Sequence, residues 1–133
     1  MTKLTKKSSH KRIIATWLEA LKSGEYKQTK GALHTKKGKK EGFCCLGVLC
    51  DLAVKAKVIP EPVATMLSTG VQEFEYESCS GTLPIPVMKW AGVHRNMGEY
   101  GLNDSLADLN DNGKKFTTIA KIIESRPEGL FRE

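Results

Sequence analysis

The stretch Phe43-Cys-Cys-Leu-Gly-Val-Leu-Cys-Asp-Leu-Ala-Val54 decides how this chain folds. It is the most apolar run in the sequence, and its apolar positions surround the whole helical circumference. This pattern is typical of a helix that is buried on all sides. Gly47 weakens the helix and leaves a buried strand as an alternative, or it lets another element approach closely. We predict a central helix over residues 43–56.

Helices are expected on both sides of this run. Ser8 and Ser9 would cap a helix from about His10 to Ser23, whose apolar residues, including Trp17, share one face. A short helix is predicted at Val63–Leu67, after two prolines.

Three more short elements are expected near the C-terminus. Pro84 and Pro86 suit the first turn of a short helix that Gly92 ends. Ser105, with an acidic residue three positions later, resembles a capping box for a brief turn. A final helix places four apolar residues on one face before Pro127 stops it.

Strands are expected in two places. Residues 32–35 and 40–43 could pair as a hairpin across the cationic tip 36–39. Residues 73–77 alternate acidic and aromatic side chains with the period of a half-buried strand. The predicted fold class is therefore α+β: four to five helices packed around a central apolar helix (43–56), with a small antiparallel β-sheet. We expect one domain over residues 1–133, with residues 1–8 flexible.

Composition is that of an ordinary globular protein, with 40% hydrophobic and 27% charged residues. No stretch approaches the ~20 apolar residues of a membrane helix, and no apolar signal-peptide core follows the cationic start. Three of the four cysteines crowd into residues 44–50, which is a poor disulfide framework. We expect free thiols, a cytoplasmic protein and no membrane partner.

Positive charge is concentrated at one end of the chain. Twelve of the twenty-one Lys and Arg residues precede Phe43 and are opposed by three Glu residues, so residues 1–42 carry a net charge of +9. The other 91 residues carry nine basic and twelve acidic side chains, a net charge of −3. Such a split favours anionic partners, although a solvated lysine face is an equally good reading.

Motifs for catalysis or metal binding are weak. On one helix, Cys44, Cys45 and Cys50 would point in different directions and could not share one zinc ion. Residues 108–113 match the start of a calcium loop, but Ile119 stands where the bidentate Glu is needed, and we interpret the segment as a turn. No histidine has a spacing that ties it to a nucleophile. We expect no cofactor, no metal and a binding protein rather than an enzyme.

The order of motifs resembles a group of small tailed-bacteriophage and prophage proteins with no established activity. The matching pieces, from about residue 14 to 124, are Trp17-x2-Ala20-Leu21-x-Ser23-Gly24-x-Tyr26-x-Gln28, Gly31-x-Leu33, Phe43-Cys-Cys-Leu-Gly-Val-Leu-Cys-Asp-Leu-Ala53, Leu83-Pro84-x2-Val87-x2-Trp90-x-Gly92 and Leu106-x2-Leu109-Asn110-Asp111-x-Gly113-x2-Phe116-x2-Ile119-Ala120. The resemblance implies a phage origin and the cytoplasm of an infected bacterial host.

Charge and resemblance together predict a counter-defence or host-takeover protein that sequesters an anionic, nucleotide-type ligand and could form homo-oligomers. The alternatives are an accessory nucleic-acid-binding protein, or an inhibitor that docks on an acidic surface of a host protein. Lysine and arginine would contact the anion, Tyr26, Gln28 and His34 would orient it, and two further residues would donate or accept hydrogen bonds. The predicted ligand-binding residues are Arg12, Tyr26, Lys27, Gln28, Lys30, His34, Lys36, Lys37, Lys39, Lys40, Asn110 and Asp111.

Overall fold

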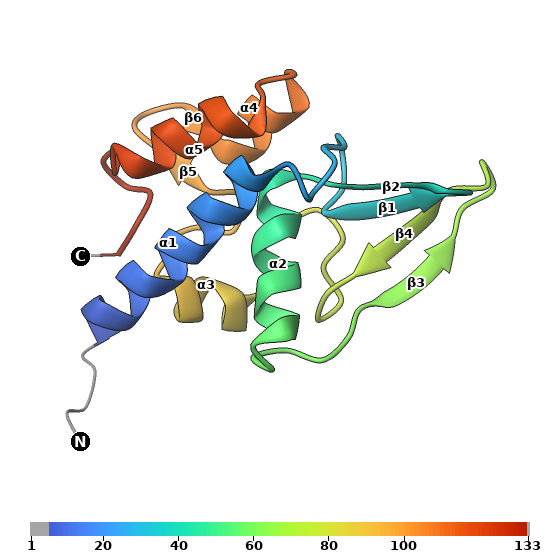
Figure 1. Ribbon diagram of the computed structural model, residues 1–133, viewed down its shortest axis with the longest axis horizontal. Helices are drawn as coiled ribbons and strands as arrows, with labels where there is room; N and C mark the ends of the chain where they lie inside the picture. Colours follow the sequence, from blue (N-terminus) through green and yellow to red (C-terminus); the bar gives the residue numbers. More distant parts are fainter. Residues whose placement is uncertain (1–5, 133) are drawn as a thin grey trace.

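The computed structural model describes residues 6–132, which form a mixed α+β structure, as the sequence predicts (Figure 1). Helix α2 (Cys45–Lys55) lies between the other helices and a four-stranded sheet. The remaining helices are α1 (Lys6–Ser23), α3 (Ile85–Ala91), α4 (Leu106–Asp111) and α5 (Phe116–Glu124).

The predicted central helix is confirmed. Cys44 is its N-cap, and the Cys44 thiol accepts a hydrogen bond from the amide of Gly47 at 3.3 Å. All six residues from 45 to 50 are buried, as an apolar run on every side requires. Gly47 also lets another segment approach α2 closely, as the sequence suggests: a Cβ atom at residue 47 would lie 1.7 Å from the carbonyl oxygen of Leu33.

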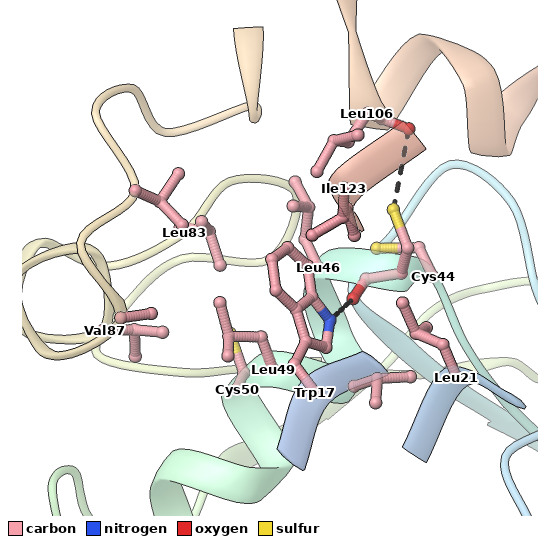
Figure 2. Close-up of a cluster of buried hydrophobic side chains, with 14 of the residues drawn as sticks. Trp17, Leu21, Cys44, Leu46, Leu49, Cys50, Leu83, Val87, Leu106 and Ile123 are labelled. Carbon is pink, nitrogen blue, oxygen red and sulfur yellow. Dashed lines mark hydrogen bonds between the residues drawn. The ribbon is translucent and has the colours of Figure 1, made fainter. Parts of the chain in front are cut away.

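Trp17 anchors α1 to this helix (Figure 2). Its side chain is fully buried, and its indole Nε1 donates a hydrogen bond to the carbonyl oxygen of Cys45 at 2.9 Å. Buried polar groups of this kind need a partner, and the first turn of α2 supplies it. Cys44 and Cys50 lie near the indole as small apolar side chains, and all four cysteines are free thiols, as expected.

The start of α1 differs from the prediction. The helix begins at Lys6, so Ser8 and Ser9 lie inside it and do not cap it. Residues 6–8, which we expected to be flexible, are helical because cationic residues are themselves good helix formers. Residues 1–5 lie outside the described part of the chain.

The main sheet is antiparallel with strand order β2-β1-β4-β3. It extends to one side of α2, away from the other helices (Figure 1). Its strands are β1 (His34–Lys37), β2 (Lys40–Phe43), β3 (Val63–Met66) and β4 (Gln72–Glu75), and a separate two-stranded ribbon joins β5 (Glu99–Tyr100) to β6 (Asp104–Ser105).

Two details of the sheet correct the sequence analysis. The hairpin turn has only two residues, Gly38-Lys39, and Gly38 has φ 62°, which suits the glycine position of a type II′ turn. β1 therefore runs two residues further than predicted. The short helix predicted at Val63–Leu67 is wrong: the segment is strand β3, because it pairs with β4 and its β-branched residues fit an exposed strand.

The C-terminal third follows the sequence more closely. The hydroxyl of Ser105 accepts a hydrogen bond from the Asp108 amide at 3.0 Å, which confirms the cap, although α4 is a short helix rather than a turn. Gly92 ends α3 with φ 77°. Beyond α5, Phe131 returns to pair with Val93 and is buried, a contact that no local pattern indicated. None of the helices in the described residues has the length and apolarity needed to span a bilayer.

Candidate ligand-binding groove

A groove of about 460 Å³ lies between the β1–β2 hairpin and the segment that precedes it. We call it the basic groove. Its lining residues are Lys27, Gln28, Thr29, Thr35, Lys37, Lys40, Glu41, Gly42 and Val71. Four of them, Lys27, Gln28, Lys37 and Lys40, are among the predicted ligand-binding residues.

Backbone hydrogen bonds hold one wall of the basic groove in place. The amide of Phe43 donates to the Lys27 carbonyl oxygen, and the amide of Thr29 donates to the Phe43 carbonyl oxygen, both at 2.8 Å. Residues 27–29 therefore run along the outer edge of β2. They come so close that a Cβ atom at Gly42 would lie 2.9 Å from the Cβ atom of Thr29. The absence of a side chain at residue 42 is what lets this wall approach the strand.

Strand alternation brings the lysines to this face. Thr35 and Lys37 project to the same side of β1, and Lys40 and Gly42 project to the same side of β2. Lys37 and Lys40 are direct cross-strand partners, a pairing of like charges that destabilises a hairpin. Among the described residues, no carboxylate forms an ion pair with Lys27, Lys37 or Lys40. An anion in the basic groove would relieve this repulsion.

The opposite face of the same strands carries the aromatic rings. His34 is stacked between Phe43 and Phe74, with ring centroids 3.9 and 4.0 Å apart. Its Nδ1 lies 2.8 Å from the Tyr76 hydroxyl, and its Nε2 lies 2.6 Å from Glu41 Oε2. His34 is only 6% exposed, so both faces and both nitrogens of its ring are occupied by the protein. Burial raises the pKa of Tyr76, which keeps the phenol neutral.

Tyr26 is also engaged away from the basic groove. Its hydroxyl donates to the Asp51 carboxylate and accepts from Lys55 Nζ at 3.1 Å, and its ring meets Phe43 edge to face. Burial and the hydrogen bond to Asp51 both raise the pKa of Tyr26. Tyr26 and His34, which we expected to orient the anion, are thus engaged within the protein: Tyr26 ties the sheet to α2, and His34 packs within the sheet.

Asn110 and Asp111 clamp the loop that leads into the sheet. Asn110 is fully buried, and its Oδ1 accepts hydrogen bonds from Gln28 Nε2 at 2.9 Å and from the Cys45 amide at 3.1 Å. Its Nδ2 donates to the Thr29 carbonyl oxygen at 2.7 Å. Asp111 accepts from the Gly31 amide at 2.9 Å. Both side chains were expected to meet a ligand, and the structure uses them to join α4, α2 and residues 28–31.

The other predicted cations do not line the basic groove. Lys36 and Lys39 lie on the same hairpin, Lys36 on its opposite face and Lys39 in its turn. Lys30 lies beside the turn after α4, with its Nζ 3.5 Å from where a Cβ atom of Gly113 would be. Arg12 is exposed on α1. The structure thus brings three of the predicted basic residues together in one hollow and spreads the rest.

Three of the four cysteines are buried at the centre of the fold. The described residues contain no cluster of three His, Cys, Asp or Glu side chains that could hold a metal ion. Burial raises the pKa of the Cys44 thiol from 9.0 to about 11, and the thiols of Cys45 and Cys50 are shifted in the same direction. Thiols of this kind stay protonated at neutral pH and are poor nucleophiles.

A second hollow, of about 390 Å³, lies around β5, β6 and the loops beside them. It mixes the cation Arg95 with the carboxylates of Glu99, Asp104 and Asp108. Its charges oppose one another, so it has no preference for an anion.

Sequence reasoning missed the small residues of the basic groove. Thr29 and Thr35 place their Oγ1 atoms 3.4 Å apart across it, and Gly42 lets them meet. The period-two pattern of residues 34–43 was the available signal, because it puts Thr35 on the face of Lys37.

A family described as a domain of unknown function, DUF8296, matches residues 9–127. No curated protein and no solved structure gives a significant match.

Proposed function

The chain belongs to the DUF8296 family, and we propose that it is a non-enzymatic protein that binds an anionic ligand in the basic groove. The observation that carries this proposal is the convergence of Lys27, Lys37 and Lys40 on one hollow without an ion-pair partner among the described residues. Three ammonium groups held by hydrogen-bonded strands are suited to phosphate oxygens.

The biological role we propose rests on the resemblance to phage and prophage proteins. The protein would act in the cytoplasm of an infected bacterium as a counter-defence or host-takeover factor that sequesters a nucleotide-type signal. Sequestration requires tight binding and no turnover, which agrees with a site built from lysines and threonines. Homo-oligomers would add capacity by placing two basic grooves in one particle, and sedimentation of the purified protein tests this.

Calorimetry against cyclic dinucleotides and cyclic ADP-ribose isomers tests the proposal. We expect binding to at least one of them, and a loss of at least tenfold in affinity in the double variant Lys37→Gln/Lys40→Gln. The matched control is Lys36→Gln/Lys39→Gln, which removes the same charge from the same hairpin outside the basic groove and should change affinity less than threefold. Absence of heat from every nucleotide would remove the proposal.

Nucleic-acid binding is the second candidate, because Lys36 and Lys39 continue the positive charge around the hairpin beyond the basic groove. A nucleic-acid backbone would contact both sets of lysines. The two double variants should then weaken a gel shift equally. Each should also make the plot of log K against log salt concentration less steep by roughly 0.9 for each of two lost phosphate contacts. A gel shift that is absent or independent of salt would exclude this candidate.

A further inference from the structure

We infer that the basic groove recognises a diphosphate group and does not read a base. This inference rests on the proposed function and specifies its ligand. It depends on what the hairpin places on each of its two faces.

The β1–β2 hairpin carries its aromatic rings on one face and the lysines of the basic groove on the other. His34 and Phe43 project from one face of the hairpin, and Lys37 and Lys40 project from the other. The ring of His34 is already covered by two phenylalanines, and Tyr26 is tied to Asp51. Among the described residues that line the basic groove, the only apolar side chain beyond threonine methyls is Val71, and none is aromatic. A base therefore finds no ring on which to stack, which is the usual way that proteins hold an unpaired base.

The charge of the three lysines in the basic groove matches two phosphates better than one. A single phosphate monoester carries a charge of about −1.5 to −2 at pH 7. Three lysines exceed this charge. Glu41 also lines the basic groove, but its carboxylate is held 2.6 Å from His34 Nε2, on the opposite face of the hairpin. On the groove side of the sheet, Glu73 pairs with Thr35 one strand further on, and it does not line the basic groove. Two adjacent phosphates balance the three lysines better than one.

Two threonine hydroxyls in the basic groove can fix the position of a phosphate. Thr29 Oγ1 and Thr35 Oγ1 lie 3.4 Å apart and share a hydrogen bond. One hydroxyl proton therefore stays free to donate to a phosphate oxygen, and both can donate once a phosphate replaces their mutual bond. Lysines supply charge without direction, whereas the two hydroxyls fix where a phosphate sits. The volume of about 460 Å³ accommodates a small phosphorylated ligand.

This arrangement separates the two classes of immune nucleotide named above. Cyclic ADP-ribose isomers contain a diphosphate, whereas cyclic dinucleotides carry two phosphodiesters that are apart from each other. The inference assigns the basic groove first to diphosphates with a free end, such as ADP, which carry more negative charge than a monoester. Between the two immune classes, whose total charge is the same, it favours the ADP-ribose class only because the two phosphates are adjacent.

The test compares ADP, GDP, CDP, UDP, AMP and inorganic pyrophosphate by ¹⁵N chemical-shift titration of the full chain. We expect the four diphosphates and pyrophosphate to bind within about threefold of one another and AMP to bind at least tenfold more weakly. A tenfold preference for one base, or equal affinity for AMP and ADP, would overturn the inference and leave anion binding intact. No shift with any probe, together with no heat in the calorimetric panel, would remove the proposed function itself.

A variant pair locates the phosphate. Thr35→Val keeps the shape of the side chain and removes its hydroxyl, and we expect it to weaken ADP binding at least fivefold. Thr65→Val is the control, because Thr65 lies in the same cross-strand row and on the same face of the sheet but outside the basic groove. Equal affinities for the two variants would show that the threonine pair does not hold a phosphate. Their amide spectra report whether each variant is folded.

Discussion

Replacing Gly47 with alanine tests the contact that positions the hairpin. A Cβ atom at residue 47 would lie 1.7 Å from the Leu33 carbonyl oxygen and 2.6 Å from its carbonyl carbon. Carbon contacts normally lie at about 3.5–4.0 Å, so α2 and the Leu33 backbone must separate by roughly 1.5–2 Å. Leu33 directly precedes β1, and its carbonyl oxygen accepts the hydrogen bond of the Cys44 amide at 3.0 Å. The substitution therefore disturbs both the helix cap and the strand that carries the basic groove.

The expected cost can be worked from three contributions. Overpacking of a well-packed interior costs about 1–3 kcal/mol. Loss of the hydrogen bond between Cys44 and Leu33 adds about 1 kcal/mol. Alanine is the better helix former by about 1 kcal/mol, which offsets part of the loss. We expect Gly47→Ala to lower the free energy of unfolding by roughly 1–3 kcal/mol.

Urea denaturation followed by tryptophan fluorescence measures this change, because Trp17 is fully buried in the folded state. With a slope of about 2 kcal/mol/M, the midpoint should fall by roughly 0.5–1.5 M. Gly81→Ala is the matched control: Gly81 has no atom within 4 Å of the added Cβ and no positive φ, so its midpoint should stay close to that of the parent. A midpoint for Gly47→Ala at or above the parent's would refute the close approach of α2 and Leu33.

Three further predictions concern the core, the clamp and alkaline pH. Trp17→Ala should cost about 3–5 kcal/mol, whereas Leu102→Ala, at a side chain that is 98% exposed, should leave the melting temperature unchanged; equal melting temperatures would contradict the docking of α1. Asn110→Ala leaves the buried amide of Cys45 without its partner and should cost about 2–4 kcal/mol in urea denaturation, and a change below about 0.5 kcal/mol would show that the clamp is not structural. Burial raises the pKa of the Cys44 thiol from 9.0 to about 11, so the unfolded chain releases this proton at a lower pH than the folded protein. The stability that the raised pKa contributes is therefore complete below pH 9 and is lost as the pH rises towards 11. The urea midpoint should therefore fall between pH 8 and pH 10.5, and a constant midpoint would contradict this linkage.

The sequence predicted the centre of the fold well because the relevant signal is local. A helix with apolar residues on every side is stable only when it is buried on every side, which places it at the centre of the protein. The observed helix at 45–55 lies within the predicted range 43–56. The segment at Val63–Leu67 shows the opposite case. Its apolar residues are too few to establish a period, and only the pairing with β4 decides that it is a strand.

Polar residues of the candidate site were harder to assign. His34 and Asn110 each look like ligand contacts in the sequence, because nothing near them in the chain accounts for their polar atoms. Each has a partner far away in the sequence: Tyr76 is 42 residues from His34, and Cys45 is 65 residues from Asn110. Buried polar side chains are nearly always satisfied inside the protein, but the partner is revealed only by the fold.

The division of the hairpin into two faces was predictable even though its turn was placed two residues too early. Because side chains alternate with a period of two, a shift of two residues leaves every side chain on its original face, whereas a shift of one would exchange the faces. Thr35 would thus lie opposite His34 in either version, whereas Lys37 joins the face of Thr35 only because the strand continues to residue 37. The total positive charge of the segment did not reveal this, since Lys36 and Lys37 contribute equally to it and only one of them lines the basic groove. For this protein the informative quantity is therefore the charge on each face of the strand. We expect Lys37→Gln to weaken anion binding and Lys36→Gln to leave it nearly unchanged, and calorimetry of the two variants measures this difference.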